Sequence, residues 1–143
     1  MTVRTTDALS GSTPFDRMKV NDIMETAVQV GHAQTQAEVL GSLMIEGFGG
    51  VPIVDDNKQL LGIVTEFDLV AALDSGKRLG DLKAQDLMTR EVIRVSPHSD
   101  MRTLIGVLQT NHLIRVPVVD RDGKLIGIVA RRDIVRGYLS AAP

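Results

Sequence analysis

Two aspartates, Asp68 and Asp133, each stand six residues after a glycine in nearly identical stretches of the chain. The first stretch reads LLGIVTEFDLV at 60–70, and the second reads LIGIVARRDIV at 125–135. An ionised carboxylate has two acceptor oxygens, which match the two donors of a cis-diol. A helix that begins beside such a carboxylate also offers backbone N–H groups and a partial positive charge to a phosphate. The two aspartates are therefore candidate ligand-binding residues.

The same aspartates have a second explanation that requires no ligand. Thr65 and Asp68 form a capping-box pattern, in which two side chains satisfy the backbone at the start of a helix. In the second stretch Ala130 stands in place of the hydroxyl residue, while Asp133 is retained. Capping alone gives little reason to keep the acid without the hydroxyl, although an acid in the first turn still stabilises the helix dipole. Ligand binding and helix-start electrostatics therefore both stay open.

Both stretches belong to a longer internal repeat. A shift of 65 residues aligns 50–70 with 115–135, and 20–24 matches 84–88 at a shift of 64. Each copy contains a β-branched segment, a helical pattern, two short strands and a second helical pattern. A unit of about 60 residues buries little surface alone, so the two copies should share one core. The sequence predicts an α+β fold built from two β-α-β-β-α units with pseudo-two-fold symmetry.

Local patterns predict where the elements of each copy begin. The segments 27–30 and 92–95 are rich in β-branched residues and should form the first strand of each copy. The stretch 35–38, Thr-Gln-Ala-Glu, matches a capping box at the start of the first helix. In the second copy, Ser99 or Asp100 can take the same position.

The chain divides into a lead-in and two repeats. Residues 1–17 are rich in Ser, Thr, Gly and Asp, which predicts a flexible segment. The repeats are expected at 18–79 and 80–143. Within the second, the Asp-Gly pair in the turn 121–124 predicts a tight hairpin between two strands.

Composition argues against several classes of function. The formal net charge of −2 and the pI near 5.9 argue against nucleic acid as a partner. The absence of cysteine excludes disulfides, thiolate metal sites and cysteine nucleophiles, and it fits a reducing cytoplasm. His32, His98 and His112 are scattered, without the spacing of metal ligands or of a catalytic arrangement. No apolar run approaches the length of a membrane span. The sequence therefore predicts neither an enzyme nor a metal site.

The order of elements resembles a tandem pair of CBS domains, the family named for cystathionine β-synthase. The features that carry the resemblance are the strands VPIVD and VPVVD and the ending Gly-x-x-(Thr/Ser)-x-x-Asp, over residues 18–139. The resemblance implies two units that pack through their small sheets. It also implies two clefts between them, where adenine nucleotides or adenosyl compounds bind. The final Asp would hold the ribose hydroxyls, and the Thr or Ser would contact ribose or phosphate.

In that family, each cleft combines the aspartate of one repeat with the first strand of the other. The resemblance assigns to the cleft at Asp133 the residues Thr26, Val28, Phe48, Ile114, Arg115, Arg131 and Arg132. It assigns to the cleft at Asp68 the residues Gly50, Thr65, Glu91, Ile93 and Leu113. Arg115 stands where a basic side chain often meets phosphate, so phosphate should prefer the cleft at Asp133. The cleft at Asp68 suits an adenosine-like or singly phosphorylated ligand, or none. The arginines have an alternative reading as solvated surface charges.

Two functions follow from these patterns. The resemblance implies a regulatory, energy-sensing module that binds AMP, ADP, ATP, S-adenosylmethionine or NAD(H) as effectors, requires no cofactor, and signals to a separate partner protein. The alternative is a ligand-free dimerisation or scaffold module, because each cleft lacks one expected group. Both predict a cytoplasmic homodimer, since helical apolar residues exceed what a small core covers. These residues are Leu69, Val70, Ile134, Val135 and Tyr138.

Overall fold

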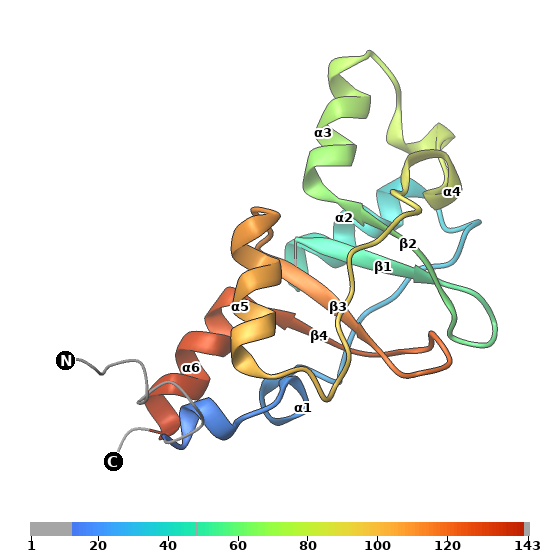
Figure 1. The fold of residues 1–143 in the computed structure, drawn as a ribbon. Helices are drawn as coiled ribbons and strands as arrows, with labels where there is room; N and C mark the ends of the chain where they lie inside the picture. Colours follow the sequence, from blue (N-terminus) through green and yellow to red (C-terminus); the bar gives the residue numbers. More distant parts are fainter. Residues whose placement is uncertain (1–12, 48, 142–143) are drawn as a thin grey trace. The chain divides into compact units, whose positions relative to one another are not determined.

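The computed structural model describes residues 13–47 and 49–141 (Figure 1). Its helices are α1 (Val20–Ile23), α2 (Ala37–Glu46), α3 (Glu66–Asp74), α4 (Ala84–Leu87), α5 (Met101–Thr110) and α6 (Arg131–Ala141). Its strands are β1 (Gly50–Val54), β2 (Leu60–Thr65), β3 (Arg115–Val119) and β4 (Leu125–Ala130). Two short 3-10 turns, η2 (Phe15–Arg17) and η3 (Leu79–Asp81), complete the described elements. The mixture of helices and two small sheets confirms the predicted α+β class.

The described residues form two compact units. Unit 1 contains 13–26, 94–121 and 126–141, and unit 2 contains the described residues of 27–93 together with 122–125. Each unit therefore joins segments from both sequence repeats. The predicted repeats, 18–79 and 80–143, remain a statement about sequence similarity, because the compact units cross these boundaries.

Unit 1 is built on the two-stranded sheet of β3 and β4, with α5 and α6 beside it (Figure 1). Helix α5 buries Met101, Leu104 and Leu108, which recur at helical spacing on one face. These side chains pack with Val20, Val95, Val116, Val118 and Val129. The small aliphatic side chains of the short sheet thus provide the surface on which α5 lies.

Unit 2 has the corresponding sheet, in which β1 and β2 are antiparallel. Its core consists of Ala37, Leu40, Met44, Val51, Ile53, Val64, Leu69 and Ala84. The register places Gly50 opposite Thr65, at the end of the sheet where α3 begins. Strand pairing therefore brings together two residues that the sequence assigns to one cleft.

The strands predicted at 27–30 and 92–95 are wrong. Neither segment forms a strand, and single bridges between Gly31 and Ile53 and between Val95 and Val118 take their place. The boundaries between the two units fall after residues 26 and 93, within or next to these segments. A stretch that leaves one compact unit for another has no continuous neighbour to pair with, so tertiary context overrides the β-propensity of its residues.

One of the two predicted helix caps forms, and the other does not. The Oδ1 atom of Asp100 accepts a hydrogen bond from the backbone N–H of Thr103 at 2.8 Å, as expected of an N-cap. The Thr35 capping box is wrong, because α2 starts after Gln36 without a side-chain cap. The hydroxyl of Thr35 instead accepts the backbone N–H of His32 at 2.9 Å. It stabilises the preceding turn instead of the helix.

The repeated glycines, Gly62 and Gly127, allow another segment to cross each strand closely. A Cβ atom on Gly62 would lie 2.8 Å from the carbonyl oxygen of Thr89, and the N–H of Ile63 donates to that oxygen at 3.0 Å. At Gly127 the corresponding carbonyl belongs to Glu25, 3.0 Å from where a Cβ would lie. Glycine is therefore required at both places to leave room for the bridge between distant segments.

The turn between β3 and β4 confirms the predicted hairpin. Its Gly123 has a φ of +83°, in the left-handed region that glycine adopts without a steric penalty.

No helix in the described part of the chain has the length and apolar character needed to cross a membrane.

We predict that Gly62→Ala destabilises the fold by about 1–3 kcal/mol, because the new methyl group is forced against the backbone of Thr89. Gly106→Ala is a matched control, since Gly106 lies in α5, is exposed and has no atom within 4 Å of the place its methyl group would take. The control should gain about 0.5–1 kcal/mol from helix propensity. Urea unfolding measures both. Equal effects of the two substitutions would contradict the close-crossing argument.

We also predict that the contribution of Asp100 to stability disappears in acid. The hydrogen bond from Thr103 lowers the pKa of Asp100 from its ordinary value of 3.8. The folded state therefore favours the carboxylate, so its stabilising effect is complete above pH 3.8 and is lost as the pH falls through the lower, folded-state pKa. Wild-type protein should exceed Asp100→Asn in unfolding free energy between about pH 5 and pH 7 and lose that advantage in acid. A difference that does not change with pH would rule this out.

Candidate functional site

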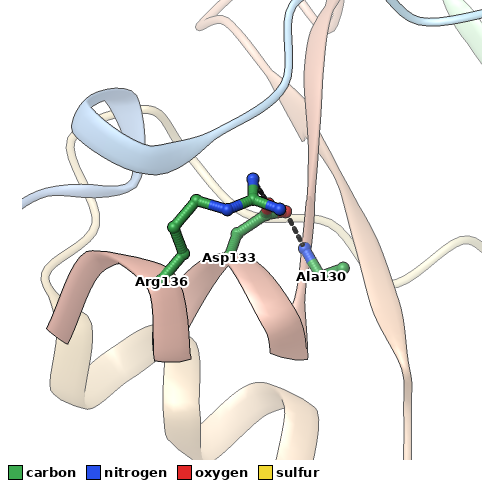
Figure 2. A network of polar contacts seen from close by, with 3 residues as sticks. All are labelled: Ala130, Asp133 and Arg136. Atoms are coloured by element: carbon green, nitrogen blue, oxygen red, sulfur yellow. Dashed lines mark hydrogen bonds and ion pairs between the residues drawn. The ribbon is translucent and has the colours of Figure 1, made fainter. Parts of the chain in front are cut away.

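Asp133 lies in the first turn of α6, directly after β4. Its Oδ2 atom accepts the backbone N–H of Ala130 at 2.8 Å, and its Oδ1 atom is 3.4 Å from Nη1 of Arg136 (Figure 2). Only 5% of Asp133 is exposed, and among the described residues it is the single charged side chain that is buried. A buried carboxylate at a helix start destabilises the folded state unless its oxygens are hydrogen-bonded or paired with a cation. This residue is therefore the centre of the site in unit 1.

The start of α6 is joined to the residues before β3. The backbone N–H of Arg131 donates to the carbonyl oxygen of Ile114 at 2.9 Å, which brings Ile114 and Arg115 beside the first turn of the helix. Ile114 is exposed, whereas Arg115 is half-buried, with its Nε atom inside. Arg131 and Arg132 are exposed. This bond places the backbone of Arg115 beside the helix start that carries Arg131, Arg132 and the buried acid.

A segment from the first repeat completes this neighbourhood. Glu25 and Ile128 exchange two backbone hydrogen bonds, of 2.8 and 2.9 Å, so that the neighbouring Thr26 belongs to unit 1. Val28 belongs to unit 2, and Phe48 lies outside the described residues. The place of Val28 and Phe48 beside Asp133 remains a prediction.

Unit 2 repeats this arrangement around Asp68 at the start of α3. The Oδ2 atom of Asp68 accepts both the backbone N–H of Thr65 at 2.8 Å and the hydroxyl of Thr65 at 3.1 Å. The backbone N–H of Glu66 donates to the carbonyl oxygen of Gly49 at 3.1 Å, which holds Gly50 near the helix start. Asp68 is half-buried. The same corner between strand and helix is thus made twice.

The partner segment of unit 2 comes from the second repeat. Thr89 pairs with Ile63 of β2, and the predicted residues Glu91 and Ile93 follow in the same unit, both exposed. Leu113 belongs to unit 1. Its place in a cleft with Asp68 therefore stays a prediction.

The structure corrects one step in the interpretation of the aspartates. Asp22 and Asp86 also accept, each at 2.8 Å, the backbone N–H of the residue three positions earlier, which is a lysine in both cases. The bond uses the main chain of the N-cap residue, so it forms without a hydroxyl side chain. The loss of the hydroxyl at Ala130 is therefore no argument against a capping role for Asp133.

Burial separates the two candidate residues from these structural equivalents. Asp22 and Asp86 are exposed, whereas Asp68 is half-buried and Asp133 is buried. Water can hydrogen-bond to the exposed carboxylates of Asp22 and Asp86. An acid removed from water at a helix start gains more from a polar ligand.

The two helix starts differ strongly in charge. Helix α6 carries Arg131, Arg132 and Arg136 together with Asp133, and Arg115 begins β3. A shift of 65 residues finds Gly50, Glu66, Phe67 and Ala71 at the corresponding places near Asp68. Sequence reasoning missed Arg136, although its i, i+3 spacing from an acid on a helix is a recognisable signal. Unit 1 therefore suits an anionic ligand, and unit 2 a neutral or cationic one.

The chemistry available at these sites is recognition. Within the described residues, no group of three His, Cys, Asp or Glu side chains is placed to hold a metal ion. The Nδ1 atom of His32 lies 3.0 Å from the carbonyl oxygen of Val54, where it supports a turn. Each site combines a carboxylate, the N-terminus of a helix of nine or eleven residues and, in unit 1, guanidinium groups.

We predict that Thr65→Ala is milder than Asp68→Ala. The first change reproduces the Ala130 arrangement and keeps the hydrogen bond that the backbone N–H of residue 65 donates to Asp68, so it should cost about 1 kcal/mol. The second leaves a partly buried backbone N–H without its acceptor and should cost about 1–3 kcal/mol. Chemical denaturation of both variants checks the order. A larger loss for Thr65→Ala would show that the hydroxyl, and not the acid, holds this corner.

The chain matches the CBS domain family twice, over residues 20–75 and 84–140. The uncharacterized protein MK0525 of Methanopyrus kandleri is 36% identical over 111 residues, which are 76% of this chain and 57% of that protein. Inosine-5'-monophosphate dehydrogenase of Methanocaldococcus jannaschii is 30% identical over 84% of this chain but only 24% of its own length. The chain thus spans less than two thirds of each of these relatives.

Two solved structures of CBS pairs match this chain over almost the whole of the chain in each crystal. CBSX2 in complex with AMP is 32% identical, with a TM-score of 0.76 over 85% of this chain and 96% of that one. The CBS domain pair of MJ0100, in complex with 5'-methylthioadenosine and S-adenosyl-L-methionine, is 26% identical. Its TM-score is 0.77, over 87% of this chain and 98% of that one.

Proposed function

The chain belongs to the CBS domain family, as a tandem pair, and on that premise we propose that it is a regulatory module that binds adenine nucleotides or adenosyl compounds. The buried carboxylate of Asp133 at the start of α6 is the observation that supports this most directly. Two similar CBS pairs bind AMP or adenosyl compounds in their crystals. The ligands of these similar pairs support the same kind of ligand for this chain.

The proposed ligand contacts follow from the chemistry at the helix starts. In unit 1, Asp133 accepts the ribose hydroxyls, while the N-terminus of α6 and Arg115 receive the phosphate. The exposed guanidinium groups of Arg131 and Arg132 supply further charge. In unit 2, Asp68 and Thr65 take the ribose of a ligand with little or no phosphate, because Glu66 opposes an anion.

Regulation would follow from a shift of conformational population. A ligand that binds one arrangement of the module more tightly than another shifts the equilibrium toward it by that difference in affinity. The responding protein is a separate chain in this proposal, and the location is the cytoplasm. We also propose a homodimer, because Val70, Val135 and Tyr138 are exposed. Leu69 is buried and Ile134 packs against the core, so these two predicted surface residues do not contribute.

A ligand-free scaffold is the second candidate, and one observation favours it. Asp68 and Asp133 already serve as helix caps, in the same way as Asp22 and Asp86, which the resemblance assigns to no ligand. A capping role by itself would account for both acids. Direct measurements of binding separate the two functions.

We predict that saturating AMP, ADP or ATP raises the melting temperature. A ligand at about 100 times its Kd adds about 2.7 kcal/mol to the free energy of unfolding. For a chain of this size, the shift should be about 5–10 °C. Differential scanning fluorimetry with these nucleotides, S-adenosylmethionine and NAD(H) measures it. A flat response to every compound would favour the scaffold.

The role of Asp133 is tested by comparing two aspartates with the same cap bond. Asp133→Asn keeps an acceptor for the N–H of Ala130 but loses the charge that holds the ribose. Nucleotide affinity should fall about 10- to 150-fold, from a loss of about 1.5–3 kcal/mol. Asp86→Asn is the control, because Asp86 caps α4 and is exposed. Calorimetric titration should find its affinity unchanged. Equal losses in both variants would mean that the substitutions act only through helix stability.

A further inference from the structure

The Oδ1 atom of Asp133 pairs with Arg136, whose side chain can be displaced by a ligand. Nη1 of Arg136 lies 3.4 Å from Oδ1, and the Arg136 side chain is 69% exposed while that of Asp133 is 5% exposed. The other oxygen, Oδ2, is fixed by the main chain of Ala130. Figure 2 shows the Arg136 side chain turned back along α6 toward the acid. Only the Arg136 end of this i, i+3 pair is exposed, so water or a ligand can replace the acid as the partner of its guanidinium group.

We infer that Arg136 determines which adenosine compound the unit 1 site accepts, by exchanging Asp133 for the phosphate of the ligand. The inference rests on the proposed function. The ribose hydroxyls displace Arg136 from Oδ1, and the guanidinium then pairs with the phosphate. The site thereby favours phosphorylated adenosine over adenosine itself.

Charge balance gives the physical reason. In the structure Asp133 neutralises the charge of Arg136 on a helix that also carries Arg131 and the partial positive charge of its N-terminus. The ribose of adenosine displaces Arg136 from Asp133, but adenosine has no phosphate with which Arg136 can then pair. The cations near the helix start therefore repel one another more strongly. A nucleotide brings the missing anion, and guanidinium binds phosphate in a favourable geometry. The cost of displacing Arg136 is therefore offset only when phosphate is present.

The other unit offers an internal comparison. The residue three positions after Asp68 is Ala71, which has no charge to exchange. The hydrogen bonds that the structure shows for the Asp68 carboxylate all end on Oδ2. Binding of adenosine in unit 2 therefore displaces no cation, and this site should discriminate weakly between adenosine and AMP.

Calorimetric titration of adenosine and AMP into the full chain tests the exchange. All proteins carry Asp68→Asn, so that the unit 1 site dominates the signal. Arg136→Gln should bind adenosine about 2- to 5-fold more tightly, because the acid is no longer occupied, and AMP about 3- to 10-fold more weakly. The preference for AMP over adenosine should therefore fall about 6- to 50-fold. Arg102→Gln removes an exposed arginine from α5 in the same unit and should leave the preference unchanged.

The outcomes separate failure of the exchange from failure of the proposed function. Binding of both ligands with an unchanged preference in Arg136→Gln overturns the exchange alone, as does equal weakening of both, which indicates a structural role. If neither the Asp68→Asn protein nor the protein with Asp68 intact binds either compound, the proposed function fails, and the inference fails with it. If only the protein with Asp68 intact binds, the ligand occupies unit 2, and the inference alone is overturned. A double-mutant cycle of Arg136→Gln and Asp133→Asn, followed by melting temperature without ligand, should show shifts that do not add. Additive shifts would show that the pair is not formed in solution and would overturn the exchange whatever the titrations give.

Discussion

The hydrogen bond that a first-turn aspartate accepts from the backbone N–H three residues earlier is the interaction on which this structure depends. It forms at the start of α1, α3, α4 and α6. In α3 and α6 it fixes the corner at which a short strand becomes a helix, and so it sets the direction of the helix N–H groups. The same bond orients a carboxylate oxygen away from the main chain. A helix-start carboxylate held in this way can bind a ligand when it is buried and has suitable neighbouring groups.

Close crossing of distant segments is the second constraint. Gly62 and Gly127 permit carbonyl oxygens of residues elsewhere in the sequence to lie against the strands. Because of these crossings, each compact unit holds a segment of the other repeat. The environment of each aspartate is consequently composed of residues far apart in the chain. Any side chain larger than hydrogen at Gly62 or Gly127 would push apart the segments that form the environment of each aspartate.

Divergence between the copies has produced two sites with different electrostatics. Helix α6 carries Arg131, Arg132 and Arg136, and Arg136 pairs with the buried acid. The start of α3 has Glu66 and Ala71 at equivalent places and keeps the hydroxyl of Thr65. Since guanidinium groups favour phosphate and a carboxylate opposes it, the two helix starts of the proposed module would prefer different adenosine compounds. Similar CBS pairs that hold different adenosine compounds fit this view.

The sequence by itself determined the repeat, the α+β class, the two helix-start aspartates and the glycines, because these depend on spacing and local patterns that each copy states independently. It also indicated the asymmetry of charge, which needs only the alignment of the copies. Tertiary structure alone decided that 27–30 and 92–95 are not strands, since an extended segment becomes a strand only where a neighbour runs beside it. It also decided that Asp133 is buried while Asp22 and Asp86 are not, and that Arg136 reaches the acid. Burial and side-chain pairing depend on which distant segments pack over a residue, and local sequence carries no record of that packing.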